Sequence, residues 1–297
     1  MLAAGLLGWA GSAAAQDLDP RRWSHLPVEV NYAGAGYAYT RADISFDPVL
    51  ELQDVEMSMH ALAAKYLRSF ELLGKSARFE LGAPVQDAHW EGLLQGAPAS
   101  TSREGLGDPV ARFAVNLIGA PPLKAGEFPA YRAATPVETT VGAGMAVQMP
   151  FGQYDETRLL NLGENRYSFR PELGVEHRRG KWLAELSGAT VFYTVNDEFW
   201  NGNERKQDPM FISQAYLSYT FRPGLWMGGG VGYGFGGETA INGVAKDDSR
   251  GNLASGIVAG VPINRAAGLK IAYLRNRTHK STGADADTLA MALSMLW

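Results

Sequence analysis

The chain has 297 residues, of which 46% are hydrophobic and 20% charged, and it contains no cysteine. This composition excludes a disordered chain and a scaffold held by disulfides. The formal net charge of -4 argues against nucleic-acid binding, which needs a clustered basic surface. Charged residues interrupt the chain too often for a membrane-spanning helix of about 18 apolar residues. The 35 glycines favour an all-β protein with closely packed strands.

Residues 1–15, MLAAGLLGWAGSAAA, form an apolar run rich in small residues. The small side chains of Ala13 and Ala15 fit the pattern that a signal peptidase accepts, so we predict a signal peptide cleaved after Ala15. No Lys or Arg precedes the run, so its n-region is truncated, and a buried N-terminal helix is the alternative. Export of a chain without cysteine fits a periplasmic or outer-membrane protein.

Residues 16–27 precede the first predicted strand and carry large aromatic and cationic side chains. We predict a periplasmic N-terminal arm that acts as a plug. Its candidate plug residues are Arg21, Arg22, Trp23 and His25.

From residue 28 to 297, apolar side chains recur at every second position, which is the period of a β-strand. In residues 76–85, for example, Phe79 and Leu81 alternate with Arg78 and Glu80. This pattern predicts about twelve strands of 10 to 13 residues, near 29–40, 55–70, 76–85, 111–117, 141–149, 167–176, 182–192, 211–221, 225–236, 252–262, 268–276 and 289–297.

The length of the predicted strands separates a membrane barrel from a soluble sandwich, whose strands usually have about 5 to 6 residues. Aromatic residues cluster towards both ends of the strands, as in two interfacial girdles. Long connections alternate with short turns such as 179–181, apart from 119–137, which we expect to hold a short helix. The long ones are expected at 41–54, 86–107, 150–166, 195–209, 237–251 and 277–287.

Together these features predict an all-β fold, a closed antiparallel transmembrane β-barrel over residues 28–297 in the outer membrane of a Gram-negative bacterium. Long loops face outwards and short turns face the periplasm. The long connections are acidic, as expected of a rim that bridges to lipopolysaccharide through divalent cations, although ordinary solvated loops explain the charge equally well. The membrane partners are therefore outer-membrane lipid and lipopolysaccharide.

If the apolar positions face lipid, the opposite faces of the strands line the lumen. These faces carry both signs of charge, which favours paired charges that stiffen the wall, with direct contact to a solute as the alternative. Glycines on the same faces leave volume for water, a solute or an inserted segment. The candidate lumen residues are Arg78, Glu80, Arg112, Asn116, Arg170, Glu172, Glu176, Glu185, Gln214 and Tyr216.

Catalytic and metal motifs are weak in this sequence. The five histidines lack metal-ligand spacing, and the Gly-x-Gly spacings after Gly228 lie outside any βαβ unit. His279 and Ser281 have the separation used by outer-membrane phospholipases, but no Asn or acid is placed to orient the imidazole. We therefore predict no catalytic residue, no metal site and no cofactor.

Several ordered blocks resemble one outer-membrane family, described as Putative MetA-pathway of phenol degradation, whose members are often called transporters. They include WSHLPVEVNYAGAGYAYTRADISFDPVL, GLGDPVARFAVNLIGAP, RPELGVEHRRGKWLAELSG, NGNERKQDP and YTFRPGLW, and they extend over residues 22–297. The resemblance implies a β-barrel for uptake of small solutes, with aromatic or hydrophobic compounds as candidates. Trp297 also resembles the C-terminal signal read by the barrel-assembly machinery.

The predicted function is thus an outer-membrane channel for passive uptake of small solutes, and not an enzyme. A non-conducting barrel with a structural or adhesion role is the first alternative. An outer-membrane hydrolase that uses Ser281 is the second.

Overall fold

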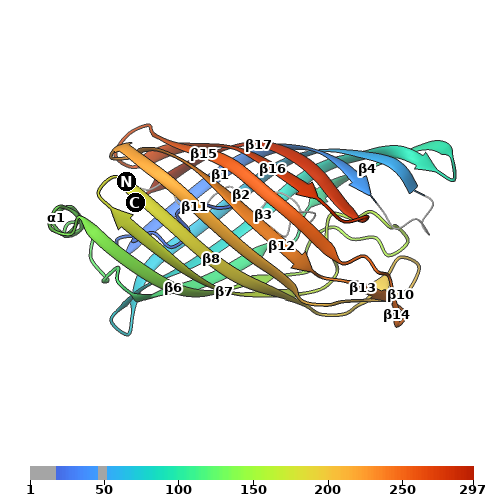
Figure 1. Ribbon diagram of the computed structural model, residues 1–297, viewed down its shortest axis with the longest axis horizontal. Coiled ribbons are helices and arrows are strands. Elements are labelled where there is room, and N and C mark those ends of the chain that lie inside the picture. The colour runs from blue at the N-terminus through green and yellow to red at the C-terminus, as the bar shows by residue number, and fades with distance from the viewer. Residues whose placement is uncertain (1–17, 46–51) are drawn as a thin grey trace.

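The computed structural model describes residues 18–45 and 52–297 (Figure 1). The predicted signal peptide, residues 1–15 with cleavage after Ala15, lies outside the described residues. The same holds for residues 46–51, the centre of the predicted connection 41–54. In the part of the chain that is described, no helix is long and apolar enough to cross a membrane.

Twelve antiparallel strands form a closed barrel, because β2 pairs with β1 on one side and with β3 on the other. Each remaining barrel strand pairs with the next one along the chain, and β1 pairs with β17. The barrel strands are β1 (Val30–Ser45), β2 (Leu52–Leu72), β3 (Lys75–Leu94), β5 (Val110–Ile118), β6 (Val137–Gln148), β7 (Ser168–Arg179), β8 (Trp182–Tyr193), β11 (Met210–Arg222), β12 (Leu225–Gly236), β15 (Arg250–Pro262), β16 (Ala267–Thr278) and β17 (Gly283–Leu296). The predicted closed barrel of about twelve strands is confirmed.

The outward and inward faces of the strands follow the predicted alternation. Leu173 and Leu186 are 63% and 62% exposed, whereas Glu172 and Glu185 are each 5% exposed. Such an apolar exterior is stable against hydrocarbon and unfavourable in water, and closure of the sheet pairs the backbone groups of its edges. The protein is therefore an outer-membrane β-barrel.

Aromatic side chains meet near both ends of the barrel wall. Phe211 and Phe235 stack with ring centroids 5.3 Å apart, and Trp182 contacts Tyr219 edge-on at 4.9 Å. The C-terminal end of the chain lies at the same end of the barrel as α1 (Phe128–Ala134) (Figure 1). That end also carries short turns such as Leu73-Gly74, where both residues have positive φ, as a two-residue hairpin turn requires. It is the periplasmic end.

Five further strands lie at the opposite, outer end of the barrel. They are β4 (Ala97–Leu106), β9 (Asn196–Phe199), β10 (Asn203–Gln207), β13 (Thr239–Ile241) and β14 (Val244–Ala245). Strand β4 pairs with the outer half of β3, and the other four form a separate sheet in the order β14-β13-β10-β9. In Figure 1, the labels β10, β13 and β14 lie together beyond the outer end of β12.

These elements correct the predicted connections. Residues 86–107 are the outer part of a β3–β4 hairpin, and 195–209 and 237–251 contain the small sheet. Only residues 279–282 separate β16 from β17, in place of the predicted 277–287. The outward face of β3 changes from Leu81 and Val85 to Asp87 and Glu91, which are exposed above the lipid. Because strands outside the membrane need no apolar face, the alternation that identifies strands within the membrane is lost there.

Candidate functional site in the barrel lumen

The segment 18–28 lies inside the barrel at its periplasmic end. Trp23 and His25 have no exposed surface, and Leu26 is 2% exposed. Val28 fixes the exit of the segment through a parallel bridge to Lys124 and a 2.8 Å hydrogen bond from its amide to the Leu123 carbonyl. The barrel wall therefore encloses a segment of its own chain.

Trp23 is held between glycines of the wall. A Cβ atom added at Gly142 of β6 or at Gly174 of β7 would overlap its indole ring. On another side, the Arg112 guanidinium lies 5.1 Å from the ring centroid of Trp23. The missing side chains on β6 and β7 thus form the recess that the indole fills.

A network of buried charges surrounds this indole. Arg22 donates to Glu172 at 2.9 Å, and Arg112 pairs with both Glu172 and Glu80, with a distance of 2.6 Å to Glu80. Lys65 completes the network with a 2.5 Å pair to Glu80. Buried charges are tolerated only when they are paired, and here a charge of the inserted segment takes part in the pairing.

Polar contacts continue towards the periplasmic exit. The Ser24 hydroxyl donates to Glu176 at 2.6 Å. The His25 ring contacts the Glu138 carboxylate at 3.1 Å and the Pro121 carbonyl at 2.7 Å. The segment is therefore bound to the wall along this whole stretch.

The other end of the segment is tied to the opposite side of the barrel. Arg21 donates to Thr220 at 2.8 Å, and its guanidinium lies 4.2 Å from the centroid of the Trp226 ring. Asp19 pairs with Lys270 at 2.8 Å. The segment consequently spans the lumen and connects β7 with β11, β12 and β16.

The predicted lumen residues are placed as follows. Nine of the ten are buried on inward faces, namely Arg78, Glu80, Arg112, Asn116, Glu172, Glu176, Glu185, Gln214 and Tyr216. Arg170 is partly buried, two residues before Glu172. Arg78 belongs to the same cluster, since it donates to the backbone carbonyls of Arg22 and Ser24.

Sequence reasoning missed Lys65, Glu138 and Asp19 as members of this site. Lys65 lies at a position of β2 that points inwards, so the alternation of inward and outward positions could have identified it. Glu138 is the second residue of β6, and the first residues of a strand are the hardest to predict from sequence. Asp19 precedes the barrel, and only its contact with Lys270, 251 residues later in the chain, gives it a place.

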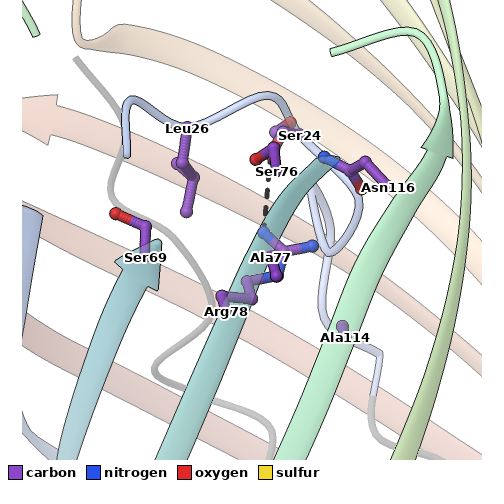
Figure 2. Close-up of a pocket in the computed structure, with 8 residues that line it drawn as sticks. All are labelled: Ser24, Leu26, Ser69, Ser76, Ala77, Arg78, Ala114 and Asn116. Atoms are coloured by element: carbon purple, nitrogen blue, oxygen red, sulfur yellow. Dashed lines mark hydrogen bonds between the residues drawn. The ribbon is translucent and has the colours of Figure 1, made fainter. Parts of the chain in front are cut away.

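Little space remains between the segment and the wall. A cavity of about 10 Å³, the size of a single water molecule, lies beside Ser24 and Leu26. Figure 2 shows both residues facing Ser76, Arg78 and Asn116 across it, with the Arg78 to Ser24 hydrogen bond dashed. At this level of the barrel, Ser24 and Leu26 thus pack closely against the wall.

The outer mouth has a different lining. Inward-facing apolar side chains of β2 and β3, among them Met57, Met59 and Trp90, form a buried cluster. Leu162, from the connection between β6 and β7, packs into it and is 4% exposed. Such a lining is unusual for the water-facing side of a membrane barrel, which is normally polar.

Among the described residues, no group of three or more His, Asp or Glu side chains is arranged to hold a metal ion. The His279 ring contacts the Tyr233 hydroxyl at 3.0 Å and stacks on the same ring at 5.5 Å. This contact places the imidazole in an aromatic pair on the barrel wall.

The family described as Putative MetA-pathway of phenol degradation matches residues 32–284. The chain belongs to this family. The match covers eleven of the twelve barrel strands, apart from the first two residues of β1, and it includes only the first two residues of β17.

One solved structure supports the fold, and two others are similar more distantly. The COG4313 outer membrane channel from Pseudomonas putida F1 is similar with a TM-score of 0.79 and 20% identity, over 94% of this chain and 100% of that one. The β-domain of the Bordetella autotransporter BrkA has a TM-score of 0.47 and 11% identity, over 91% of this chain and 100% of that one. The CymD monoaromatic hydrocarbon channel has a TM-score of 0.47 and 8% identity, over 94% and 91%. No curated protein matches the chain.

Proposed function

We propose that the protein is an outer-membrane channel for passive uptake of small solutes, and that the segment 18–28 is its plug. The observation that carries the proposal is the way in which the segment fills the lumen. The wall supplies glycines at Gly142 and Gly174 in place of side chains, so its shape is matched to a segment that is not part of the wall. A barrel without an inserted segment would fill the same space with the side chains of its own strands.

Aromatic or hydrophobic compounds are the solute class that we propose. The description of the family refers to phenol degradation. The apolar cluster of Met57, Met59 and Trp90 gives the outer mouth surfaces on which an aromatic ring can pack. Solutes of this class cross general water-filled pores less readily than polar ones.

A non-conducting barrel with a structural role is the second candidate. It is favoured by the small residual cavity of about 10 Å³ beside the plug. A barrel that is closed in its resting state fits both proposals, and only a measurement of conduction separates them. We propose no catalytic role for His279, because its ring is engaged by Tyr233.

The test is single-channel recording of the folded chain from residue 16 to 297 in a planar bilayer, with phenol and benzoate as blockers. The channel proposal predicts discrete conductance steps that an aromatic compound blocks. Circular dichroism of the same sample controls for folding. Silence from a folded barrel, both with the plug and after its deletion, would establish the non-conducting role.

We also propose that the last strand is the element read by the barrel-assembly machinery. Leu293 and Met295 of β17, and Trp297 directly after it, are 52%, 55% and 57% exposed. Replacement Trp297→Ala should lower the amount of folded protein in the outer membrane, measured by heat-modifiable mobility in gels. Ser294→Ala, on the inward face of β17, is the control.

A further inference from the structure

Three arginines from separate segments meet at the outer end of the lumen. Arg166 lies two residues before β7, Arg205 lies in β10 and Arg250 begins β15. All three act electrostatically on the Glu164 carboxylate. Burial raises the pKa of Glu164, but the arginines outweigh this effect and hold its pKa below the usual value.

Arg166 is the most deeply placed of the three, with 3% of its surface exposed. Its Nε and Nη2 atoms donate to Glu164 at 2.9 and 2.8 Å, and Nη2 also reaches Gln207 at 2.5 Å. The guanidinium lies 4.4 Å from the ring centroid of Tyr193. Its Nη1 atom is buried and has no hydrogen-bond partner within residues 18–45 and 52–297. A buried guanidinium N–H without an acceptor is unfavourable, so this donor is ready for an incoming anion.

Positive charge gathers at this place. The three arginines face the carboxylates of Glu164 and Asp248, and the Asp108 carboxylate lies next to Glu164, whose amide donates to it at 2.8 Å. The Asp248 carboxylate is already engaged, since it accepts from the amide and the hydroxyl of Thr239, both at 2.6 Å. Burial, together with the positive charge of Arg166 and Arg250, lowers the pKa of Arg205 to about 10. A bound carboxylate would accept from the Nη1 donor of Arg166 and lessen the repulsion among the three arginines.

We propose that Arg166, Arg205 and Arg250 form an anion site in the outer mouth that receives the carboxylate of a small aromatic acid. The inference rests on the proposed channel function and names the class of its solute. The carboxylate accepts from the free Nη1 of Arg166, and the other two arginines supply the remaining charge.

Two observations favour an aromatic monoanion over inorganic phosphate. The Tyr193 ring lies 4.4 Å from the Arg166 guanidinium, so an aromatic surface is present beside the unpartnered donor. Apolar side chains also lie directly beside the arginines, because Val191, Met210 and Ile212 form a buried cluster against which Tyr193 packs. An apolar body joined to one carboxylate uses both surfaces.

The experiment is calorimetric titration of benzoate into the folded full chain in detergent. Arg166→Gln should weaken benzoate binding at least about tenfold, because it removes a charge-assisted hydrogen bond from a buried site. Arg158→Gln is the matched control. Arg158 lies in the same connection between β6 and β7, but its side chain is 48% exposed and pairs with Asp155 at 2.8 Å. This variant should change affinity by less than about twofold.

Ligand variants test the chemistry of the site. Benzyl alcohol, which keeps the ring and lacks the carboxylate, and phosphate, which lacks the ring, should each bind at least about tenfold more weakly than benzoate. If Arg166→Gln fails to fold by circular dichroism, Arg250→Gln takes its place with the same expectation. Equal affinity for benzoate and benzyl alcohol, or equal loss in the Arg166 and Arg158 variants, would overturn the site.

Binding and conduction are measured separately, so the two proposals can fail independently. A wild-type chain that conducts but does not bind benzoate removes the anion site and leaves the channel in place. A chain that binds benzoate but stays silent in bilayers, with and without its plug, removes the channel and leaves the site.

Discussion

In the periplasmic half of the lumen, a segment of the chain fills the barrel, whereas in the outer mouth the wall and its connections supply the filling. The periplasmic half matches charge to charge, as in Arg22 with Glu172. The outer mouth combines an apolar cluster around Met57 with a group of arginines, among them Arg166, whose buried Nη1 has no partner in the described part of the chain. The first region is occupied by the chain itself, and the second offers a donor to a ligand.

The difference indicates a division of roles. Paired buried charges fix the position of a segment but leave no binding capacity for a solute. An apolar surface next to a group of arginines offers both attraction and specificity for a small amphipathic anion. We infer that the outer mouth selects the solute and that the segment in the periplasmic half closes the channel.

Deletion of residues 16–27 should produce the largest effect. It removes Trp23 and Arg22 from the lumen and leaves the recess at Gly142 and Gly174 open. Single-channel conductance should rise about fivefold or more, because a twelve-stranded barrel without an inserted segment has room for a water-filled path. An unchanged conductance would show that the segment is not the barrier.

A single methyl group should displace the same segment. Gly174→Ala places a Cβ atom in the volume of the Trp23 indole. Because the chain has no cysteine, Ser24→Cys creates a unique label site, and this position is 1% exposed in the native fold. Maleimide labelling of that cysteine should be slow in the parent and about tenfold faster with Gly174→Ala, as expected for local opening.

The control for this displacement is Gly188→Ala in the adjacent strand β8. A Cβ atom there would meet only the Ile212 carbonyl oxygen, at 3.8 Å, which is an ordinary contact. Labelling should then remain at the parental rate. Equal acceleration by both substitutions would mean that the barrel as a whole, and not the Trp23 recess, has loosened.

Glu172→Gln should lower the stability of the folded barrel. The substitution removes the partner shared by Arg22 and Arg112, and loss of one member of a buried ion pair costs about 3 to 5 kcal/mol. Glu204→Gln breaks an exposed 2.7 Å pair with Lys206, and should cost less than about 1 kcal/mol. Guanidinium unfolding in detergent compares the two, and similar losses would contradict a stabilising role of the lumen network.

The sequence predicted the barrel strands, because lipid contacts one face of each strand along its whole length and the lumen contacts the other. Positions that face lipid require apolar side chains such as Leu173 and Leu186. The alternation of apolar and polar residues therefore predicted which face of each barrel strand points outwards, and it placed Glu172 on the inward face. The grouping of Arg22 and Trp23 ahead of the first strand also led to the prediction of a plug, and the structure places both side chains in the lumen.

The contacts of the plug could not be predicted, because its partners depend on how strands more than a hundred residues away are placed. Gly174 illustrates this: nothing in its local sequence distinguishes it from other strand glycines, yet it makes room for Trp23. Arg166 lies in a segment predicted to be a loop, and its position depends on the connections that also carry Glu164 and Gln207. Outside the membrane, strands do not need an apolar face towards lipid, so the alternation of apolar and polar residues no longer identifies them.

The smallest effect is expected where the apolar mouth holds the connection between β6 and β7. Leu162→Ala removes a buried side chain from the Met57 cluster and should cost about 2 to 5 kcal/mol locally. The expected result is several-fold faster tryptic cleavage after the exposed Arg158, with an unchanged midpoint for unfolding of the barrel, because the connection can detach while the closed sheet persists. Phe151→Ala in the same connection, where the side chain is 61% exposed, should leave the cleavage rate unchanged. A lowered unfolding midpoint in Leu162→Ala would instead make the mouth cluster part of the barrel's cooperative core, and the separation between a rigid closed half and an adaptable mouth would then fail.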